Sequence, residues 1–169
     1  MAYIAVFDEI MECSSFNIES IDQTTALGRF LGGKAQPGFV YCLDGDLGAG
    51  KTTLTQAIAA GLKLDDGNYI SSPSFAIMHE YPGEIPLYHM DFYRLHDADD
   101  VIALGFDEYF YRQGLTVIEW SKRASEILPE QLLTITITLN HNNSRTLKIC
   151  ATSQYLSLLK DLRAQFSLK

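Results

Sequence analysis

The feature that most constrains the fold of this chain is a glycine-rich stretch at residues 45–52. It matches the pattern Gly-x-x-x-x-Gly-Lys-[Ser/Thr] at every specified position, with the residues Gly45, Asp46, Leu47, Gly48, Ala49, Gly50, Lys51 and Thr52. The preceding residues 39–44 are apolar and predict a buried strand, and residues 53–62 predict a helix that ends near Gly61. A strand, a glycine loop and a helix in this order are the context in which the pattern binds phosphate.

The chemistry of phosphate binding explains these residue types. Glycine allows backbone dihedrals that residues with a Cβ avoid, so successive N–H groups can turn inward and surround phosphate oxygens. The start of the following helix adds unpaired N–H groups and the positive end of the helix dipole. Lys51 is expected to reach the β- and γ-phosphates, and the Thr52 hydroxyl is expected to bind Mg²⁺. The stretch therefore predicts a site for a nucleoside triphosphate and Mg²⁺.

Length and composition limit the class of protein. The chain has 169 residues, which favours a single domain over residues 1–169 with no linker. Hydrophobic residues make up 47% of the chain and charged residues 20%, and no apolar run approaches the length of a membrane span. Residues 1–9 lack the basic segment of a secretory signal. These observations predict a globular cytoplasmic protein that does not contact a membrane.

The charge of the chain argues against direct binding of nucleic acid. The formal net charge is −8, and no cluster of Lys and Arg interrupts the acidic balance. Proteins that bind nucleic acid directly normally carry a basic face, because neutralising phosphates supplies most of their non-specific affinity. Any contact with a nucleic acid is therefore expected to pass through a partner protein.

The chain contains three cysteines, Cys13, Cys42 and Cys150. Their number is odd, and each lies in an apolar or strand-like segment. This pattern favours reduced thiols in the core over a disulfide framework or a metal site.

Two pairs of short segments predict antiparallel hairpins. Residues 76–81 and 87–93 flank a turn at residues 82–84, and residues 132–140 and 144–151 alternate Thr with Ile or Leu around a second turn. A purely parallel sheet is therefore not expected. With the strand and helix around the glycine loop, the hairpins predict an α/β fold with a mixed sheet.

The remaining segments predict helices, short strands and turns. Ser20 is the expected N-cap of a helix that ends at Gly32, and Ser121 is the expected cap of a helix that follows a strand at residues 115–118. Residues 65–68 predict a turn. The other expected elements are one or two short strands within residues 1–18, a short helix from residue 97, a helical turn at residues 106–110, and a closing helix with Leu156, Leu159, Leu162 and Phe166 on one face.

Two acidic residues are candidates for holding Mg²⁺ and orienting water. Glu119 follows four apolar residues, as an acid at the end of a buried strand does in phosphate-loop enzymes. Asp91 lies in the second strand of the first predicted hairpin. The alternatives are an exposed acid at a strand end for Glu119 and a surface pair with Arg94 for Asp91. The sequence does not divide the two catalytic roles between these acids.

Three further features near these acids have two interpretations each. Residues 72–74, Ser-Pro-Ser, form either a switch loop, whose hydroxyl meets Mg²⁺ or the γ-phosphate, or a plain turn. His89 has a spacing from Asp91 that is compatible with a transition metal, but too few other ligands are near, and we do not predict such a site. Trp120 could stack on a base or a partner, and packing in the core is preferred.

The glycine loop, the Ser-Pro-Ser-Phe segment at residues 72–75, the Tyr-His-Met-Asp-Phe-Tyr-Arg-Leu run at residues 88–95 and the Ile-Glu-Trp segment at residues 118–120 occur in a characteristic order. Together they resemble the bacterial ATPase of tRNA threonylcarbamoyladenosine biosynthesis, the TsaE (formerly YjeE) family. The resemblance covers about residues 20 to 165. Ser74 stands where the family usually has Thr, which preserves the hydroxyl.

This resemblance implies a three-layer α/β fold like that of phosphate-loop (P-loop) NTPases, Mg²⁺-dependent ATP binding and weak ATP hydrolysis. It also implies a complex with the TsaB and TsaD proteins, which modify the adenosine beside the tRNA anticodon, while the transfer site lies in a partner. By the family pattern, the loop with Thr53 binds ATP, Ser74 belongs to the switch, and Thr52, Asp91 and Glu119 serve Mg²⁺ and the attacking water.

Three other functions remain open at this point. A small-molecule kinase would also use the glycine loop, but it would need a substrate site and an Arg-bearing lid, and Arg112 and Arg123 are isolated. A regulatory GTPase would need an [Asn/Thr]-Lys-x-Asp motif, and the nearest string, at residues 62–65, begins with Leu. A nucleotide-gated adaptor with little turnover is the third alternative.

Overall fold

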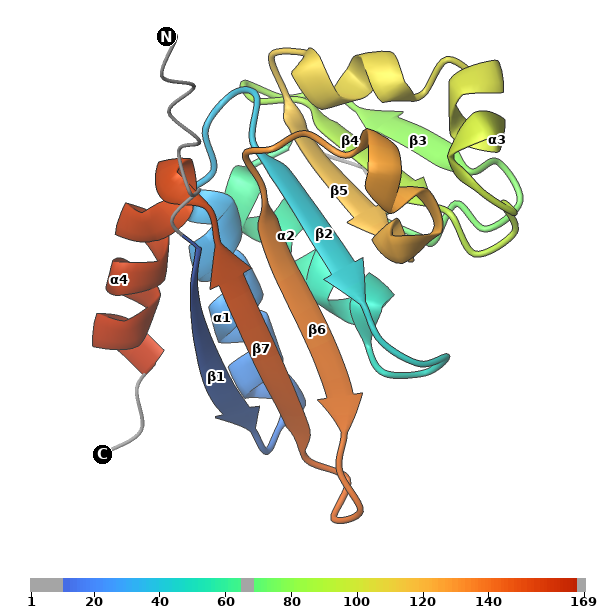
Figure 1. Ribbon diagram of the computed structural model, residues 1–169. Helices are drawn as coiled ribbons and strands as arrows, with labels where there is room; N and C mark the ends of the chain where they lie inside the picture. Colours follow the sequence, from blue (N-terminus) through green and yellow to red (C-terminus); the bar gives the residue numbers. More distant parts are fainter. Residues whose placement is uncertain (1–10, 65–68, 167–169) are drawn as a thin grey trace, which may run out of the picture.

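The computed structural model describes residues 11–64 and 69–166, which form a mixed seven-stranded sheet with helices on both faces (Figure 1). The strands lie in the order β1-β7-β6-β2-β5-β4-β3. The four central strands β6, β2, β5 and β4 are parallel, whereas β1, β7 and β3 run antiparallel to their neighbours. The predicted α/β fold with a mixed sheet is therefore confirmed. The strands are β1 (Glu12–Ile18), β2 (Val40–Asp44), β3 (Met78–Tyr81), β4 (Leu87–Asp91), β5 (Leu115–Glu119), β6 (Leu133–Leu139) and β7 (Arg145–Ala151).

Helices cover the two faces of the sheet unequally. α1 and α2 lie behind the sheet in Figure 1, and α4 lies beside β1 and β7. α3 and the 3₁₀-helices η1 and η2 pack on the opposite face of the half of the sheet that contains β2, β5 and β4. This half has three layers. The helices are α1 (Ile21–Gly33), α2 (Lys51–Leu62), α3 (Ala98–Ala103) and α4 (Leu156–Phe166), with η1 (Asp107–Tyr111), η2 (Ser121–Ile127) and η3 (Ser153–Tyr155).

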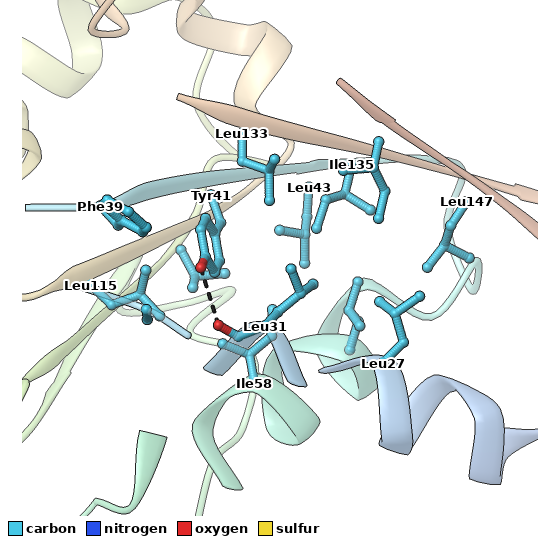
Figure 2. Close-up of a cluster of buried hydrophobic side chains, with 14 of the residues drawn as sticks. Leu27, Leu31, Phe39, Tyr41, Leu43, Ile58, Leu115, Leu133, Ile135 and Leu147 are labelled. Atoms are coloured by element: carbon cyan, nitrogen blue, oxygen red, sulfur yellow. Dashed lines mark hydrogen bonds between the residues drawn. The ribbon is translucent and has the colours of Figure 1, made fainter. Parts of the chain in front are cut away.

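The central strand β2 is buried on both faces, which explains its unbroken apolar sequence. Tyr41 and Leu43 point toward α1 and α2, and the alternate side chains pack against η2 and its neighbours. Figure 2 shows Leu27 and Leu31 of α1 directed toward this side of the strand. The Tyr41 hydroxyl donates a hydrogen bond to the backbone carbonyl of Leu31, 3.1 Å away. Side chains on both faces of the sheet therefore pack against β2.

α1 and α2 approach each other through glycine. A Cβ on Gly32 of α1 would lie only 1.9 Å from the backbone oxygen of Ile58 in α2, and a Cβ on Gly61 of α2 would lie 2.1 Å from the oxygen of Arg29 in α1. Real Cβ atoms do not come this close to backbone oxygens. Only glycine fits at this contact, and the contact fixes the position of α2, the helix that follows the glycine loop.

The prediction that all three cysteines are reduced is wrong for two of them. Cys13 and Cys150 form a disulfide bond that joins β1 to β7. The two residues are partners in the antiparallel ladder, so their side chains meet on the same face of the sheet. This register depends on which strands pair, and the sequence alone does not reveal it. Cys42 is a free, buried thiol, and burial raises its pKa to about 12.

Most predicted elements are confirmed, with one further correction. Both hairpins form, and the Ser20 hydroxyl caps α1 by accepting a hydrogen bond from the backbone N–H of Gln23. Ser121 is not an N-cap, because Trp120 occupies that position and the Ser121 hydroxyl donates instead to Asp44. The turn expected at residues 65–68 and the first ten residues lie outside the described part of the chain. No helix among the described residues is long and apolar enough to cross a membrane.

Candidate nucleotide-binding site

The glycine loop lies at the carboxyl end of β2 and leads directly into α2. Gly45 opens the loop with φ +151°, and a Cβ at this position would lie 2.4 Å from the backbone oxygen of Ile137 in β6. Gly50 ends the loop in the left-handed conformation, as the N-cap of α2. The sequence therefore places glycine where the backbone dihedrals and a neighbouring strand both exclude larger residues.

The Lys51 side chain folds back over the loop that precedes it. Its ammonium donates hydrogen bonds to the backbone carbonyls of Gly45, at 2.7 Å, and Asp46, at 2.9 Å. It also lies 4.0 Å from the centre of the Trp120 ring. Burial lowers the pKa of the Lys51 ammonium from its ordinary value, and the carboxylates of Glu119 and then Asp91 act in the opposite direction. The predicted phosphate ligand is therefore a buried cation at the mouth of the loop.

Glu119 ends β5 and is bound to α2 and to the neighbouring strand. One carboxylate oxygen, Oε2, accepts a hydrogen bond from the Thr52 hydroxyl at 3.1 Å. The other, Oε1, accepts one from the Thr55 hydroxyl at 3.4 Å and lies 2.8 Å from Nε2 of His89. Only 2% of Glu119 is exposed. The alternative of an exposed acid at a strand end is therefore wrong, and Glu119 lies beside the expected Mg²⁺ ligand Thr52.

Asp91 ends β4, beside Glu119 in the parallel ladder. Its Oδ2 accepts hydrogen bonds from the hydroxyls of Ser72, at 2.6 Å, and Ser74, at 3.1 Å. The alternative in which Asp91 pairs with Arg94 is wrong. The Arg94 guanidinium carbon instead lies 4.3 Å from the centre of the Phe75 ring. The loop at residues 72–74 is thus tied to the carboxylate by two hydroxyls.

Trp120 packs against the edge of the core and is not enclosed by it, so the packing preferred from the sequence is confirmed only in part. It is half-buried and adopts a left-handed backbone with φ +60°, while its backbone N–H donates to the backbone carbonyl of Leu43. One side of its ring meets Tyr93, with ring centres 5.1 Å apart, and the ring also receives the Lys51 ammonium. Asp44 stabilises the turn by accepting hydrogen bonds from the Ser121 hydroxyl and the Lys122 N–H. Trp120 therefore forms one wall of the site.

A hollow of about 390 Å³, including the open space at its mouth, lies beside the glycine loop on the side that faces α1 and the β6–β7 hairpin. Its walls come from the first turn of α1, the loop, the first turn of α2 and the β6–β7 hairpin. Arg145 of β7 lies at its edge, where Nε donates a 2.8 Å hydrogen bond to the carbonyl of Ala49. The lining is mainly apolar, with a few polar groups: Ile21, Thr24, Ala49, Gly50, Thr53, Leu54, Ile137, Arg145 and Leu147.

The residues around Thr52 suit Mg²⁺ better than a transition metal. Mg²⁺ prefers oxygen ligands and usually binds one or two carboxylates together with phosphate oxygens and water. The Thr52 hydroxyl and Glu119 Oε2 are such oxygens, 3.1 Å apart. Within residues 11–64 and 69–166, no group of three or more His, Cys, Asp or Glu side chains could hold a metal by itself. The donor set fits a cation that shares its ligands with a nucleotide.

Fold and loop together define the class of the protein, an α/β protein with a P-loop NTPase-like fold, in which the site lies at the carboxyl ends of parallel strands. A solved structure supports this class. The crystal structure of YdiB from Bacillus subtilis aligns with a TM-score of 0.78 and 32% sequence identity, and the match covers 94% of this chain and 99% of that one.

Sequence comparison identifies the family. The model of the family "Threonylcarbamoyl adenosine biosynthesis protein TsaE" matches residues 18–147. The tRNA threonylcarbamoyladenosine biosynthesis protein TsaE of Bacillus subtilis is 40% identical over 139 residues, which are 82% of this chain and 85% of that protein. TsaE of Treponema pallidum is 35% identical over 139 residues, 82% of this chain and 99% of its own. The chain belongs to the TsaE family, which takes part in the biosynthesis of threonylcarbamoyladenosine in tRNA.

The sequence predicted the main groups of the site but missed three that support them. Asp44, Thr55 and Arg145 were not among the candidates. Thr55 follows Thr52 by three residues, which places both hydroxyls on one face of a helix, so helical spacing was a usable signal. Asp44 and Arg145 gave no comparable signal, because their partners lie far away along the chain.

Proposed function

We propose that this chain is a P-loop ATPase that binds MgATP, hydrolyses it slowly, and supports threonylcarbamoylation of tRNA together with TsaB and TsaD. One observation carries the proposal. The Glu119 carboxylate is hydrogen-bonded to the hydroxyl of Thr52, directly after the loop lysine Lys51, so a carboxylate and a hydroxyl meet where a phosphate-bound Mg²⁺ would lie. We take residues 1–169 as a single cytoplasmic domain.

In this proposal the backbone N–H groups of residues 45–52, with Thr53 at the start of α2, bind the phosphate chain, and Lys51 contributes its charge to the β- and γ-phosphates. A bound Mg²⁺ supplies charge that neutralises the phosphate oxygens. Thr52 and Glu119 hold the Mg²⁺ shell. Asp91 and Ser74 position the attacking water and the loop at residues 72–74, because this loop already bonds to Asp91.

Weak ATP binding by the chain alone is expected from the position of Lys51. Its ammonium bonds to two carbonyls of its own loop and lies over Trp120. Phosphate oxygens must compete with these partners, so part of the binding energy is used to move the ammonium. A partner protein that moves Lys51 away from these carbonyls and from Trp120 would remove this cost and strengthen ATP binding.

We propose that the adenine base lies in the hollow beside the loop. Thr52 and Glu119 mark the γ-phosphate side, and the hollow touches Gly50 and Thr53 on the other side. Its mainly apolar lining suits an aromatic base, and Arg145 is placed to stack on the base or bind the ribose. The chain lacks the [Asn/Thr]-Lys-x-Asp motif of GTPases, which favours ATP over GTP.

Contact with partner proteins is expected at the mouth of the site. Leu47 at the tip of the loop is 78% exposed, and Phe75 beside the loop at residues 72–74 is 86% exposed. Apolar side chains this exposed beside a nucleotide site suit a docking surface that responds to the nucleotide. With a net charge of −8, contact with tRNA is expected through TsaB and TsaD only.

Phosphate release and complex formation test this function together. We expect slow release of phosphate from ATP by the chain alone, faster release with TsaB and TsaD, and a complex in size-exclusion chromatography with a non-hydrolysable ATP analogue but not with ADP. Equal complex formation with both nucleotides would contradict the proposal. Nucleotide-dependent assembly without turnover would favour the adaptor, which exposed Phe75 also suits. Phosphate transfer to a small metabolite in a coupled assay would favour the kinase.

A further inference from the structure

His89 is a fully buried histidine beside the candidate catalytic carboxylate. It lies on β4, two residues before Asp91, so both side chains project from the same face of the strand. Its Nε2 lies 2.8 Å from Oε1 of Glu119. The other ring nitrogen, Nδ1, is buried and has no hydrogen-bond partner among residues 11–64 and 69–166.

The two oxygens of Glu119 have different surroundings. Oε1 lies 2.8 Å from Nε2 of His89, whereas Oε2 accepts a hydrogen bond from the hydroxyl of Thr52. The Thr55 hydroxyl is 3.4 Å from Oε1 and closer, at 3.0 Å, to the carbonyl of Lys51. A carboxylate can otherwise rotate about its terminal bond and exchange its oxygens. A donor of its own on each oxygen opposes this rotation. Oε2 therefore stays directed toward Thr52, where the proposed function requires an oxygen.

The unpartnered nitrogen indicates what the ring contributes. The carboxylate partner assigns the ring hydrogen to Nε2, which leaves Nδ1 as an unused acceptor. A buried polar atom without a partner costs about 1–3 kcal/mol, and a leucine would avoid this cost at a position that served packing alone. The ring is thus placed to donate one hydrogen bond, the one to Glu119.

We propose that His89 is a positioning residue that holds the Glu119 carboxylate in the orientation needed for Mg²⁺ and water. This inference rests on the proposed ATPase function. His89 touches neither nucleotide nor metal and acts through Glu119. Since a displacement of about 1 Å in a catalytic group can cost about a hundredfold in rate, loss of the bond is expected to lower kcat by about ten- to a hundredfold, with a much smaller change in KM for ATP.

Two amide substitutions separate the hydrogen bond from packing. In His89→Gln the side-chain amide nitrogen reaches the place of Nε2, whereas in His89→Asn it corresponds to Nδ1 and falls short of Glu119. Both variants are polar and smaller than histidine. Met90→Leu, a change at the next buried residue on the opposite face of β4, is the matched control.

The variants are compared in kcat, KM, melting temperature, and the Mg²⁺ concentration that half-restores ATP binding in calorimetry. We expect His89→Gln and Met90→Leu to stay close to the parent protein. His89→Asn should lose kcat and need several-fold more Mg²⁺. Equal values for His89→Asn and His89→Gln, or parental values for both, would overturn the inference.

Two further outcomes, a variant that does not fold and a parent protein without ATPase activity, can be distinguished from failure of the inference. If His89→Asn does not fold, His89→Leu removes the same hydrogen bond with a side chain suited to a buried position, and parental kcat and Mg²⁺ requirement in this variant would overturn the inference instead. If the parent protein binds ATP but shows no turnover even with partners, the proposed ATPase function fails. The Mg²⁺ dependence of ATP binding then still decides the role of His89.

Discussion

The contact between α1 and α2 gives a prediction whose size follows from the structure. In Gly32→Ala, the new Cβ would lie 1.9 Å from the backbone oxygen of Ile58 and 2.9 Å from the nitrogen of Leu62. An ordinary contact needs more than about 3.3 Å, so the two helices must separate by roughly 1 Å. Overpacking of this kind costs about 1–3 kcal/mol, while the better helix propensity of alanine returns about 0.5–1 kcal/mol.

The net result is a loss of about 0.5–2 kcal/mol in the free energy of unfolding, or about 1–8 °C in melting temperature. Urea unfolding measures this value from the midpoint at constant slope. The matched control is Gly33→Ala on the same helix, where a Cβ would lie 3.8 Å from its nearest neighbour, the oxygen of Gly61. This variant should equal or slightly exceed the parent in stability. If Gly32→Ala were as stable as Gly33→Ala, the tight helix contact would be refuted.

Further predictions concern the disulfide, the loop lysine and the two acids. Cys13→Ser should lower the free energy of unfolding by about 2–4 kcal/mol under oxidising conditions and have no such effect in excess dithiothreitol, where the parent has lost the same bond. Bound phosphate favours the ammonium form of Lys51, whose pKa burial lowers in the free protein, so ATP binding should take up protons at alkaline pH and weaken as pH rises toward 10.5. Calorimetry in buffers of different ionisation enthalpy counts these protons, and no proton uptake at alkaline pH would contradict the prediction. Asp91→Ala and Glu119→Ala should each lower turnover far more than ATP affinity, and a parental rate in either would remove that residue from the site.

The fold was predictable where the signal is local. The strand, loop and helix around residues 45–52, the two hairpins and the Ser20 cap all follow from neighbouring residues and are confirmed. The Cys13–Cys150 bond was not predictable, because it depends on the pairing of β1 with β7, the first and last of the described strands along the chain, and the two cysteines are 137 residues apart. The close contact of α1 with α2 likewise becomes evident only when Gly32 and Ile58 are brought together.

The candidate site was likewise predictable where its residues are marked by their local sequence, and not where they depend on strand pairing. Lys51 and Thr52 come from the loop itself, and Asp91 and Glu119 were expected from their places at strand ends. The partners that hold the acids could not be assigned, since His89 meets Glu119 only through the pairing of β4 with β5. Trp120 was expected to pack in the core, yet it lies at the edge of the core with a left-handed backbone and its ring meets the Lys51 ammonium.

Calorimetric titration of MgATP into the parent protein and into Lys51→Ala tests the central claim most directly. The substitution removes one buried ammonium at the mouth of the loop and no core packing, so the variant should keep its melting temperature within a few degrees. A charge-assisted contact to phosphate contributes about 1.5–3 kcal/mol, which predicts a ten- to hundredfold loss of ATP affinity. Equal ATP affinity in a folded Lys51→Ala variant, or no ATP binding by the parent protein, would contradict the account.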